Sequence, residues 1–326
     1  MLFDFLTIFV GIVLVIGLSD LVIKNSIHVA EHFHLSGTFV GLTILSIGSS
    51  IPEIMTHVVG SVAILKNPEA MNTISGLVIG TNIGSDMFLQ NFVLPVVGLI
   101  GIIVVKRQAL MIEIGALIGA SLLVWILSIG GILSRWEGLI LIAAYAAYFL
   151  YLAKSNHLNE QVSKHVNEGR NHVFIALGLI IVCFVVIAVV TSLIVDAAVM
   201  IVQLLPISAS LFGVIFLGFA SALPEFTMAL ISIYKGQKEI SAGILIGGNI
   251  TNPLIGIGLG ATISEYTVPD VSILYDLPVK IATALLLYIF LLRKEDLNKW
   301  EAVTLIGLFL AYLTLRNMLF PQDFPS

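Results

Sequence analysis

The sequence predicts an all-α polytopic membrane protein, with ten transmembrane helices arranged as two inverted five-helix repeats and with broken helices at the centre. Composition is the first observation behind this prediction: 58% of the 326 residues are hydrophobic and 11% are charged, against about a quarter charged residues in average chains. The second is a series of ten long apolar stretches. The third is a polar motif in the second stretch that recurs in the seventh.

Each predicted span is a run of about twenty apolar residues, the length at which a helix crosses the hydrocarbon core of a bilayer. The first run, 6–23, lacks a basic leading segment and a small-residue cleavage site, so we expect a permanent span rather than a signal peptide. The spans are centred near residues 14, 50, 86, 118, 143, 186, 222, 252, 282 and 308.

One polar segment, 154–171, is long enough to be a linker. It separates a first repeat, 1–153, with spans one to five, from a second repeat, 172–326, with spans six to ten. Because each half has an odd number of spans, the second half enters the membrane from the opposite side. The two halves are therefore expected to be related by a pseudo-two-fold axis in the membrane plane.

Lys and Arg gather on one side of this topology. The connections after odd-numbered spans hold eleven, which are Lys24, Lys106, Arg107, Lys154, Lys164, Arg170, Lys235, Lys238, Arg293, Lys294 and Lys299. The opposite side holds four, which are Lys66, Arg135, Lys280 and Arg316. Because cytoplasmic connections carry the excess of positive charge, we expect an integral protein of the cell membrane whose 154–171 loop is cytoplasmic and whose termini are both outside.

The repeated motif is Gly-Ser-Ser-Ile-Pro-Glu at 48–53 and Ala-Ser-Ala-Leu-Pro-Glu at 220–225, an offset of 172 residues. Proline removes a backbone donor and clashes with the preceding turn, so we expect it to break the helix and free carbonyl oxygens near Ser46 and Gly218. Lipid supplies no hydrogen bonds, so such breaks and buried acids need protein or a polar cavity around them. Duplicated broken helices are typical of an ion or substrate site at the midplane of a transporter.

The polar atoms of the motif are oxygen ligands. Backbone carbonyls, serine hydroxyls and the carboxylates of Glu53 and Glu225 are hard donors, which suit Na⁺, Ca²⁺ or Mg²⁺. Two glutamates also carry enough charge to balance one divalent ion. A proline kink whose glutamate faces a neighbouring helix explains one motif, but a symmetric pair argues against it, because an unpaired buried carboxylate is costly.

The third and eighth spans carry glycines that let another backbone approach, followed by amides or an acid at helical spacing. Asn82, Asp86 and Gln90 form one polar stripe, and Asn249 and Asn252 lie three residues apart. Hydrogen bonding between helices explains Asn82 and Gln90 equally well. Asp86, a third carboxylate at membrane depth, is the stronger candidate for a role in the site.

Other chemistries are poorly supported. His28, His32 and His34 lie close together in the first cytoplasmic connection, yet we expect no metal site there. The single cysteine, Cys183, can form no internal disulfide. The net charge of −5 comes without a basic stripe, so we expect no nucleic-acid partner.

These residues resemble the α-repeats of the cation/calcium exchanger (CaCA) superfamily, particularly its sodium/calcium exchanger branch. The family pattern is Gly-Thr/Ser-Ser-x-Pro-Glu on one broken helix and Gly-Asn-x-x-Gly-Ser-Asn-x-x-Asn/Asp on the next, in both inverted halves. The resemblance covers both repeats and the ten-span layout, and it implies that Glu53 and Glu225 are the central cation ligands. The remaining candidate ligands are Ser49, Ser50, Ser85 and Ser221, the backbone near Ser46 and Gly218, and Asp86, Asn249 and Asn252.

The chain departs from this pattern at several ligand positions. Asp86 stands where the family commonly has Asn, and the other departures are Leu89 in the first repeat and Ala222, Gly248 and Asn252 in the second. Fewer oxygen ligands imply fewer Na⁺ sites, H⁺ coupling through the glutamates, or another divalent ion. We expect Asp86 to replace a missing ligand or to set the coupling; a hydrogen bond to a neighbouring helix is the alternative.

The function implied is secondary active antiport that exports Ca²⁺ against Na⁺, by alternating access around Glu53 and Glu225. The nearest alternative is exchange of H⁺ for Ca²⁺ or another divalent cation. An intramembrane hydrolase is a remote one, because the chain has no His-Glu-x-x-His zinc motif. The expected partners are inorganic cations and the lipid bilayer, without a cofactor, and a monomer is expected to suffice for transport.

Overall fold

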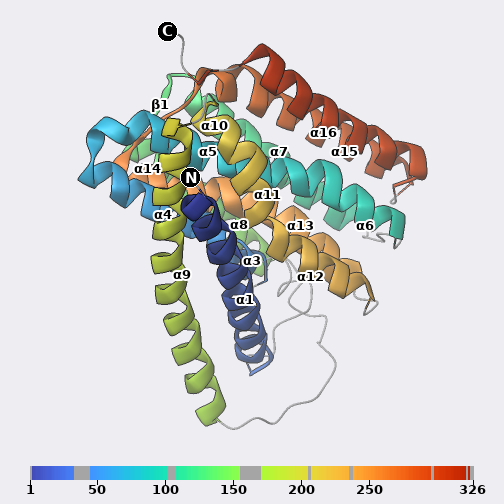
Figure 1. Cartoon of the computed structure of the whole chain (residues 1–326). Coiled ribbons are helices and arrows are strands. Elements are labelled where there is room, and N and C mark those ends of the chain that lie inside the picture. The colour runs from blue at the N-terminus through green and yellow to red at the C-terminus, as the bar shows by residue number, and fades with distance from the viewer. Residues whose placement is uncertain are drawn as a thin grey trace.

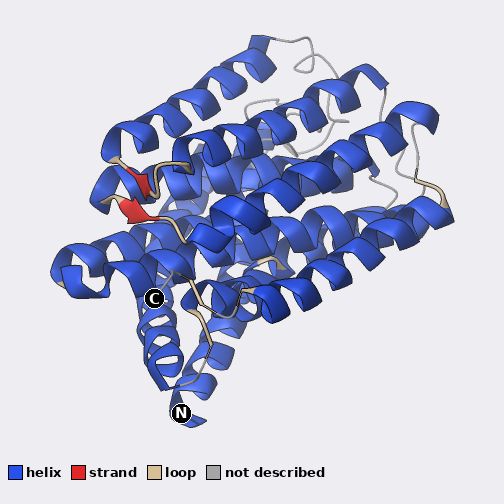
Figure 2. Cartoon of the chain, turned by 90° about the horizontal axis from the view of Figure 1, so that it is seen from above, coloured by secondary structure: helices blue, strands red, loops and turns tan. Residues whose placement is uncertain are grey.

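The computed structural model describes residues 2–32, 45–100, 107–154, 170–204, 207–234, 238–294, 297–320 and 322–323. Almost all of these residues are helical (Figure 2). Within these ranges eight helices are long and apolar enough to cross a membrane, and 112–128 forms a shorter apolar helix. The prediction of a helical membrane protein is therefore confirmed, whereas the count of ten spans stays a prediction.

The first half of the chain forms α1 (Leu2–His32), α3 (Ser46–Ser49), α4 (Ile51–Lys66), η2 (Pro68–Ala70), α5 (Met71–Phe88), η3 (Leu89–Val93), α6 (Leu94–Ile100), α7 (Arg107–Ser128) and α8 (Arg135–Lys154). The second half forms α9 (Arg170–Leu204), α10 (Ala209–Phe212), η5 (Gly213–Leu217), α11 (Gly218–Ser221), α12 (Leu223–Tyr234), α13 (Lys238–Thr251), η6 (Asn252–Ile257), α14 (Gly258–Ser264), η7 (Ser272–Asp276), α15 (Leu277–Lys294) and α16 (Lys299–Leu319). The segments η3, η5, η6 and η7 are π-helical turns.

Eight of the ten predicted span centres fall inside helices. The other two, residues 50 and 222, fall in the breaks between α3 and α4 and between α11 and α12. Each break is followed by a proline in the first turn of the next helix, where the missing N–H has no helical partner to lose. The breaks therefore lie where the repeated motif predicts them, 172 residues apart.

Helix α5 runs through the centre of the bundle, and its side chains from Ile74 to Phe88 are all buried. It packs against α10, η5 and α11 with backbone touching backbone. A Cβ atom at Gly80 would collide with the backbone of Ser210, and one at Gly84 with that of Val214. The close approach predicted for these glycines is confirmed.

Helices α1 and α9 pack against each other on one face of the molecule and run steeply to most of the other helices (Figure 1). Only about a quarter of each apolar span is buried inside the protein. Their inner faces form a second apolar core with Ile51, Leu77 and Leu217. The pair thus covers the region of the two breaks while presenting a wide apolar surface outward.

A short antiparallel pair, which the sequence did not predict, joins β1 (Ile132–Leu133) to β2 (Tyr266–Thr267), with Ile132 opposite Thr267. Two residues are too few to show the alternation by which a strand is recognised. The Asp270 N–H donates to the carbonyl of Asp323 at 3.2 Å. The connections after the predicted fourth and eighth spans and the C-terminal residues thus meet at one end of the molecule (Figures 1 and 2).

Two of the four cations counted on the outer side do not lie in connections. Lys280 lies within α15 and Arg316 within α16, with 1% and 0% of their side chains exposed. Each forms an ion pair, with Asp86 and Asp276 respectively. The count was wrong there because a local charge pattern does not distinguish a buried cation from an interfacial one. His34 and positions 155–169 of the predicted linker lie outside the described residues, as do the side chains of His28 and His32.

Candidate cation site

Both glutamates of the repeated motif are buried, with 1% of Glu53 and 0% of Glu225 exposed. Each lies in the first turn of the helix that follows a break, α4 or α12, where the positive end of the helix dipole favours a carboxylate. They lie close enough to interact electrostatically. The breaks thus bring together, in one buried region, two acids from opposite halves of the chain.

Serine hydroxyls hold one oxygen of each carboxylate. Ser85 of α5 donates to Glu53 Oε1 at 2.9 Å, and Ser50 donates to Glu225 Oε1 at 3.4 Å. The second oxygen of each glutamate is buried and has no hydrogen-bond partner among the described residues. A buried acceptor without a donor is costly, so these two oxygens are the atoms most in need of a ligand.

The serines at the ends of α3 and α11 are related in the same way as the glutamates. Ser49 donates to the Ser46 carbonyl and Ser221 to the Gly218 carbonyl, both at 3.2 Å. Ser221 also lies beside Glu53, and Ser49 beside Glu225. Each glutamate is therefore faced by the serine of the opposite repeat.

The carbonyls of Ser46 and Gly218 are not freed from the helix, contrary to expectation. They accept the N–H groups of Ser50 and Ala222 at 3.0 and 3.2 Å, in addition to the serine hydroxyls. Because proline has no N–H, the carbonyls that lose a helical donor lie four residues before Pro52 and Pro224. The Ser46 hydroxyl is also engaged, in a hydrogen bond of 3.0 Å with the Thr251 hydroxyl.

Two of the departures from the family pattern meet beside Glu225. A Cβ atom at Gly248 would lie 3.6 Å from Leu89 Cδ1, 3.8 Å from Glu225 Cγ and 3.9 Å from Ser50 Oγ. The surroundings of the two acids therefore differ. Glu53 is faced by the hydroxyl of Ser85, whereas the same region near Glu225 has an apolar side chain and no side chain at all.

Asp86 is paired with a cation that sequence reasoning missed. Its Oδ2 forms an ion pair with Lys280 Nζ of α15, and its Oδ1 accepts Asn252 Nδ2 at 3.1 Å. Both charged side chains are buried. An acid at membrane depth requires such a partner, but nothing local in the sequence indicates which of the lysines provides it.

The remaining amides divide between ligation and packing. Gln90 Nε2 donates to Thr283 Oγ1 at 2.9 Å, so it links helices, as the alternative for this residue predicted. Asn249 Nδ2 donates to the Leu245 carbonyl of its own helix at 3.0 Å. The side-chain oxygens of Asn82, Asn249 and Asn252 have no partner within the described ranges.

A buried polar cluster, also missed, lies farther along the Glu53 face of α4. The Tyr266 hydroxyl donates to the His57 carbonyl at 2.9 Å and lies 2.7 Å from Ser61 Oγ. Burial raises the pKa of Tyr266, so the hydroxyl keeps its proton and this hydrogen bond. The cluster fastens β2 to α4, one and two turns beyond Glu53.

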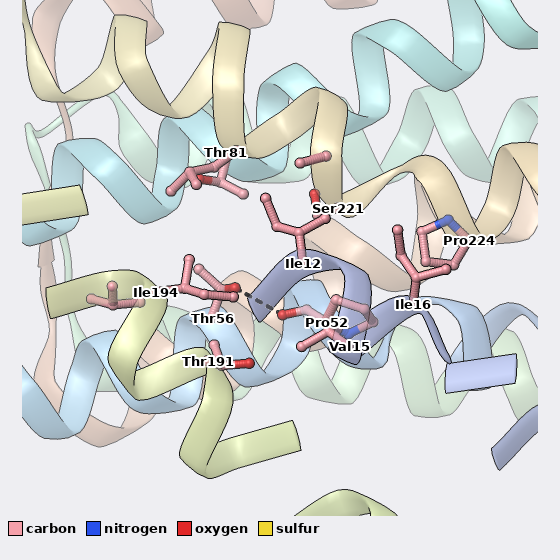
Figure 3. A pocket seen from close by; sticks show the side chains of 13 residues that line it. Ile12, Val15, Ile16, Pro52, Thr56, Thr81, Thr191, Ile194, Ser221 and Pro224 are labelled. Carbon is pink, nitrogen blue, oxygen red and sulfur yellow. Dashed lines mark hydrogen bonds between the residues drawn. The ribbon is translucent and has the colours of Figure 1, made fainter. Parts of the chain in front are cut away.

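A pocket lies between the α1–α9 pair and the two breaks (Figure 3). It leaves ≈ 40 Å³ for the centres of water-sized molecules, more than the roughly 10–15 Å³ that one water needs. Its wall combines apolar side chains of α1 and α9 with both motif prolines and four hydroxyls. The residues labelled in the figure are Ile12, Val15, Ile16, Pro52, Thr56, Thr81, Thr191, Ile194, Ser221 and Pro224.

Fold and site together define a helical membrane protein with paired acids at two symmetric helix breaks. The chain belongs to the sodium/calcium exchanger protein family, whose model matches residues 3–154 and 175–318. This membership makes it a membrane-embedded cation antiporter and places it among exchangers rather than hydrolases.

Individual relatives cover nearly the whole chain. It is 24% identical over 324 residues to inner membrane protein YrbG of Escherichia coli, covering 96% of both chains. It is 23% identical over 355 residues to sodium/calcium exchanger MaX1 of Methanosarcina acetivorans, covering 96% of this chain and 98% of that protein. The solved structure of the sodium–calcium exchanger NCX_Mj of Methanococcus jannaschii has a TM-score of 0.67 and 22% identity, covering 95% and 98% of the two chains. The structural likeness shows that the fold is shared.

Proposed function

We propose that the protein exchanges Ca²⁺ for Na⁺, with Glu53 and Glu225 as the central ligands. The observation that carries this proposal is the reciprocal arrangement at the breaks, where the serine of each repeat lies beside the glutamate of the other. An ion between the two carboxylates would contact both halves of the chain at once. That is the requirement for a site to which two halves give access in turn.

The available donors suit a hard cation. Both glutamates have an unpartnered oxygen, and so do Asn249 and Asn252, within the part of the chain that is described. The hydroxyls of the four predicted serines lie around them, so carboxylate, amide and hydroxyl oxygens reach the six to eight that Ca²⁺ takes. Two carboxylates balance the charge of one Ca²⁺, which offsets the cost of burying it.

The larger architecture follows from the same proposal. Residues 1–153 and 172–326 form the two inverted repeats, with ten spans in all and 154–171 as a cytoplasmic linker between them. Both termini lie outside, and one chain suffices for transport. The strand pair and the Asp270–Asp323 hydrogen bond support this, because the predicted topology ends its even-numbered spans on one side.

Exchange of H⁺ for Ca²⁺ is the second candidate, and one observation favours it. Leu89 and Gly248 leave the side of Glu225 without an oxygen that a bound Na⁺ would use. A proton needs no such ligand, because it binds the carboxylate directly.

Radioactive Ca²⁺ uptake into proteoliposomes, with Na⁺ and H⁺ gradients imposed separately, tests the proposal. An outward Na⁺ gradient at equal pH should drive uptake, and a pH gradient without Na⁺ should not. Uptake driven only by the pH gradient would establish the second candidate. Uptake under neither gradient would contradict both.

A further inference from the structure

We propose that the ammonium group of Lys280 is a built-in cation of the transport site, which neutralises Asp86 and removes one monovalent-cation position from the exchange cycle. This inference rests on the proposed transport function around Glu53 and Glu225. It concerns the number of charges exchanged and holds whether the driving ion is Na⁺ or H⁺.

The first support is the charge count. Glu53, Glu225 and Asp86 are all buried, at 1%, 0% and 0% exposure, and Lys280 is 1% exposed. With its ammonium in place the group carries two net negative charges rather than three. One Ca²⁺ neutralises it, and so do two monovalent cations, which makes exchange of the two electrically silent.

The second support is that the ion pair belongs to the site. Ser85, next to Asp86, donates to Glu53, and Asp86 is near enough to repel the Glu53 carboxylate. Asn252 donates its amide N–H to Asp86, so its oxygen, which has no partner within the described ranges, points away from that acid. The pair therefore sets the charge beside the site and orients one candidate ligand.

The third support is that Lys280 is fixed in place. Its carbonyl accepts Gln90 Nε2 at 3.2 Å and Thr283 Oγ1 at 3.1 Å, so both helices are tied together beside the ion pair. A dissolved cation competing for Asp86 Oδ2 would have to displace a tethered ammonium from a buried position. Lys280 thus behaves as a permanent counter-ion rather than an exchangeable one.

The test measures the charge carried per Ca²⁺ in proteoliposomes whose membrane potential is clamped with K⁺ and valinomycin. Wild-type uptake should not depend on the potential, and neither should that of Lys280→Arg, which keeps the positive charge. In Lys280→Gln an extra cation is needed at Asp86, so an inside-positive potential should accelerate Ca²⁺ uptake. Active Lys280→Gln protein with potential-independent uptake would overturn the proposal, as would potential-dependent uptake by the wild type.

A second measurement decides the question if Lys280→Gln is inactive. Asp86→Asn leaves an uncompensated ammonium beside the site, so the Ca²⁺ concentration for half-maximal uptake should rise about tenfold or more. In Asp86→Asn with Lys280→Gln the repulsion is gone, and most of that rise should be reversed. Equal values in the single and double variants would overturn the proposal. If no gradient drives uptake in the wild type, the proposed function itself fails, which is a distinguishable result.

Discussion

The Ser50 hydroxyl donates a hydrogen bond of 3.4 Å to the Glu225 carboxylate, although the two residues are 175 positions apart. Ser50 ends one broken helix and Glu225 begins the continuation of the other. With Ser221 beside Glu53, this contact makes each half of the chain a partner of the other half's acid. Any rearrangement of one half against the other must therefore alter the surroundings of both carboxylates.

Ser85→Ala should weaken Ca²⁺ binding. It removes the hydroxyl that lies 2.9 Å from Glu53 Oε1, and a hydrogen bond to a charged group contributes about 1.5–3 kcal/mol, so half-maximal uptake should require roughly tenfold more Ca²⁺. Ser75→Ala on the same helix is the matched control, because Ser75 is buried and has no hydrogen-bond partner in the described structure. Equal Ca²⁺ dependence in the two variants would contradict the role of Ser85.

Gly248→Ser should restore an oxygen beside Glu225. The added Cβ has only ordinary contacts, at 3.6 Å or more, so the variant should fold. If Na⁺ is the driving ion, the new hydroxyl should lower the Na⁺ concentration for half-maximal Ca²⁺ exchange. Gly119→Ser, at a position with no atom within 4 Å of its added Cβ, controls for the substitution itself. An unchanged Na⁺ dependence of Gly248→Ser would argue that this side of Glu225 does not bind Na⁺.

Arg316→Met should destabilise the fold without altering ion specificity. Arg316 is wholly buried and pairs with Asp276 at 3.1 Å, and removing one partner of a buried pair costs about 3–5 kcal/mol. Adding Asp276→Asn should recover much of the thermal stability, measured by unfolding in detergent. Arg135→Met, at an exposed position, is the control. A Tm of Arg316→Met equal to that of the control would refute the expectation.

The helix breaks and the central glycines could be predicted because their signals are local. A proline next to an acid in an apolar run indicates a break wherever the chain folds, and its recurrence at 172 residues indicates the symmetry. Glycines at helical spacing predict close packing of α5, although not the partner helix. The amino-acid sequence alone therefore indicates that Glu53 and Glu225 lie at the two breaks.

The partners of buried charges could not be predicted in the same way. Lys280 is 194 positions from Asp86, and its neighbours in sequence give it the same pattern as an interfacial lysine. The π-helical turns and the two-residue strands escape periodicity for a different reason, since each is shorter than the window in which a period can be recognised. The carbonyls of Ser46 and Gly218 keep their helical donors because each proline deprives only the carbonyl four residues before it.

The most direct test of the central claim is Ca²⁺ uptake by proteoliposomes containing Glu53→Gln or Glu225→Gln. Each substitution keeps the shape of the side chain and removes one of the two charges that balance the divalent ion. Both variants should elute as folded protein and lose nearly all Ca²⁺ uptake, whereas Glu69→Gln, at an exposed position, should transport like the wild type. Near-normal Ca²⁺ uptake by either folded glutamine variant would contradict the assignment of the site.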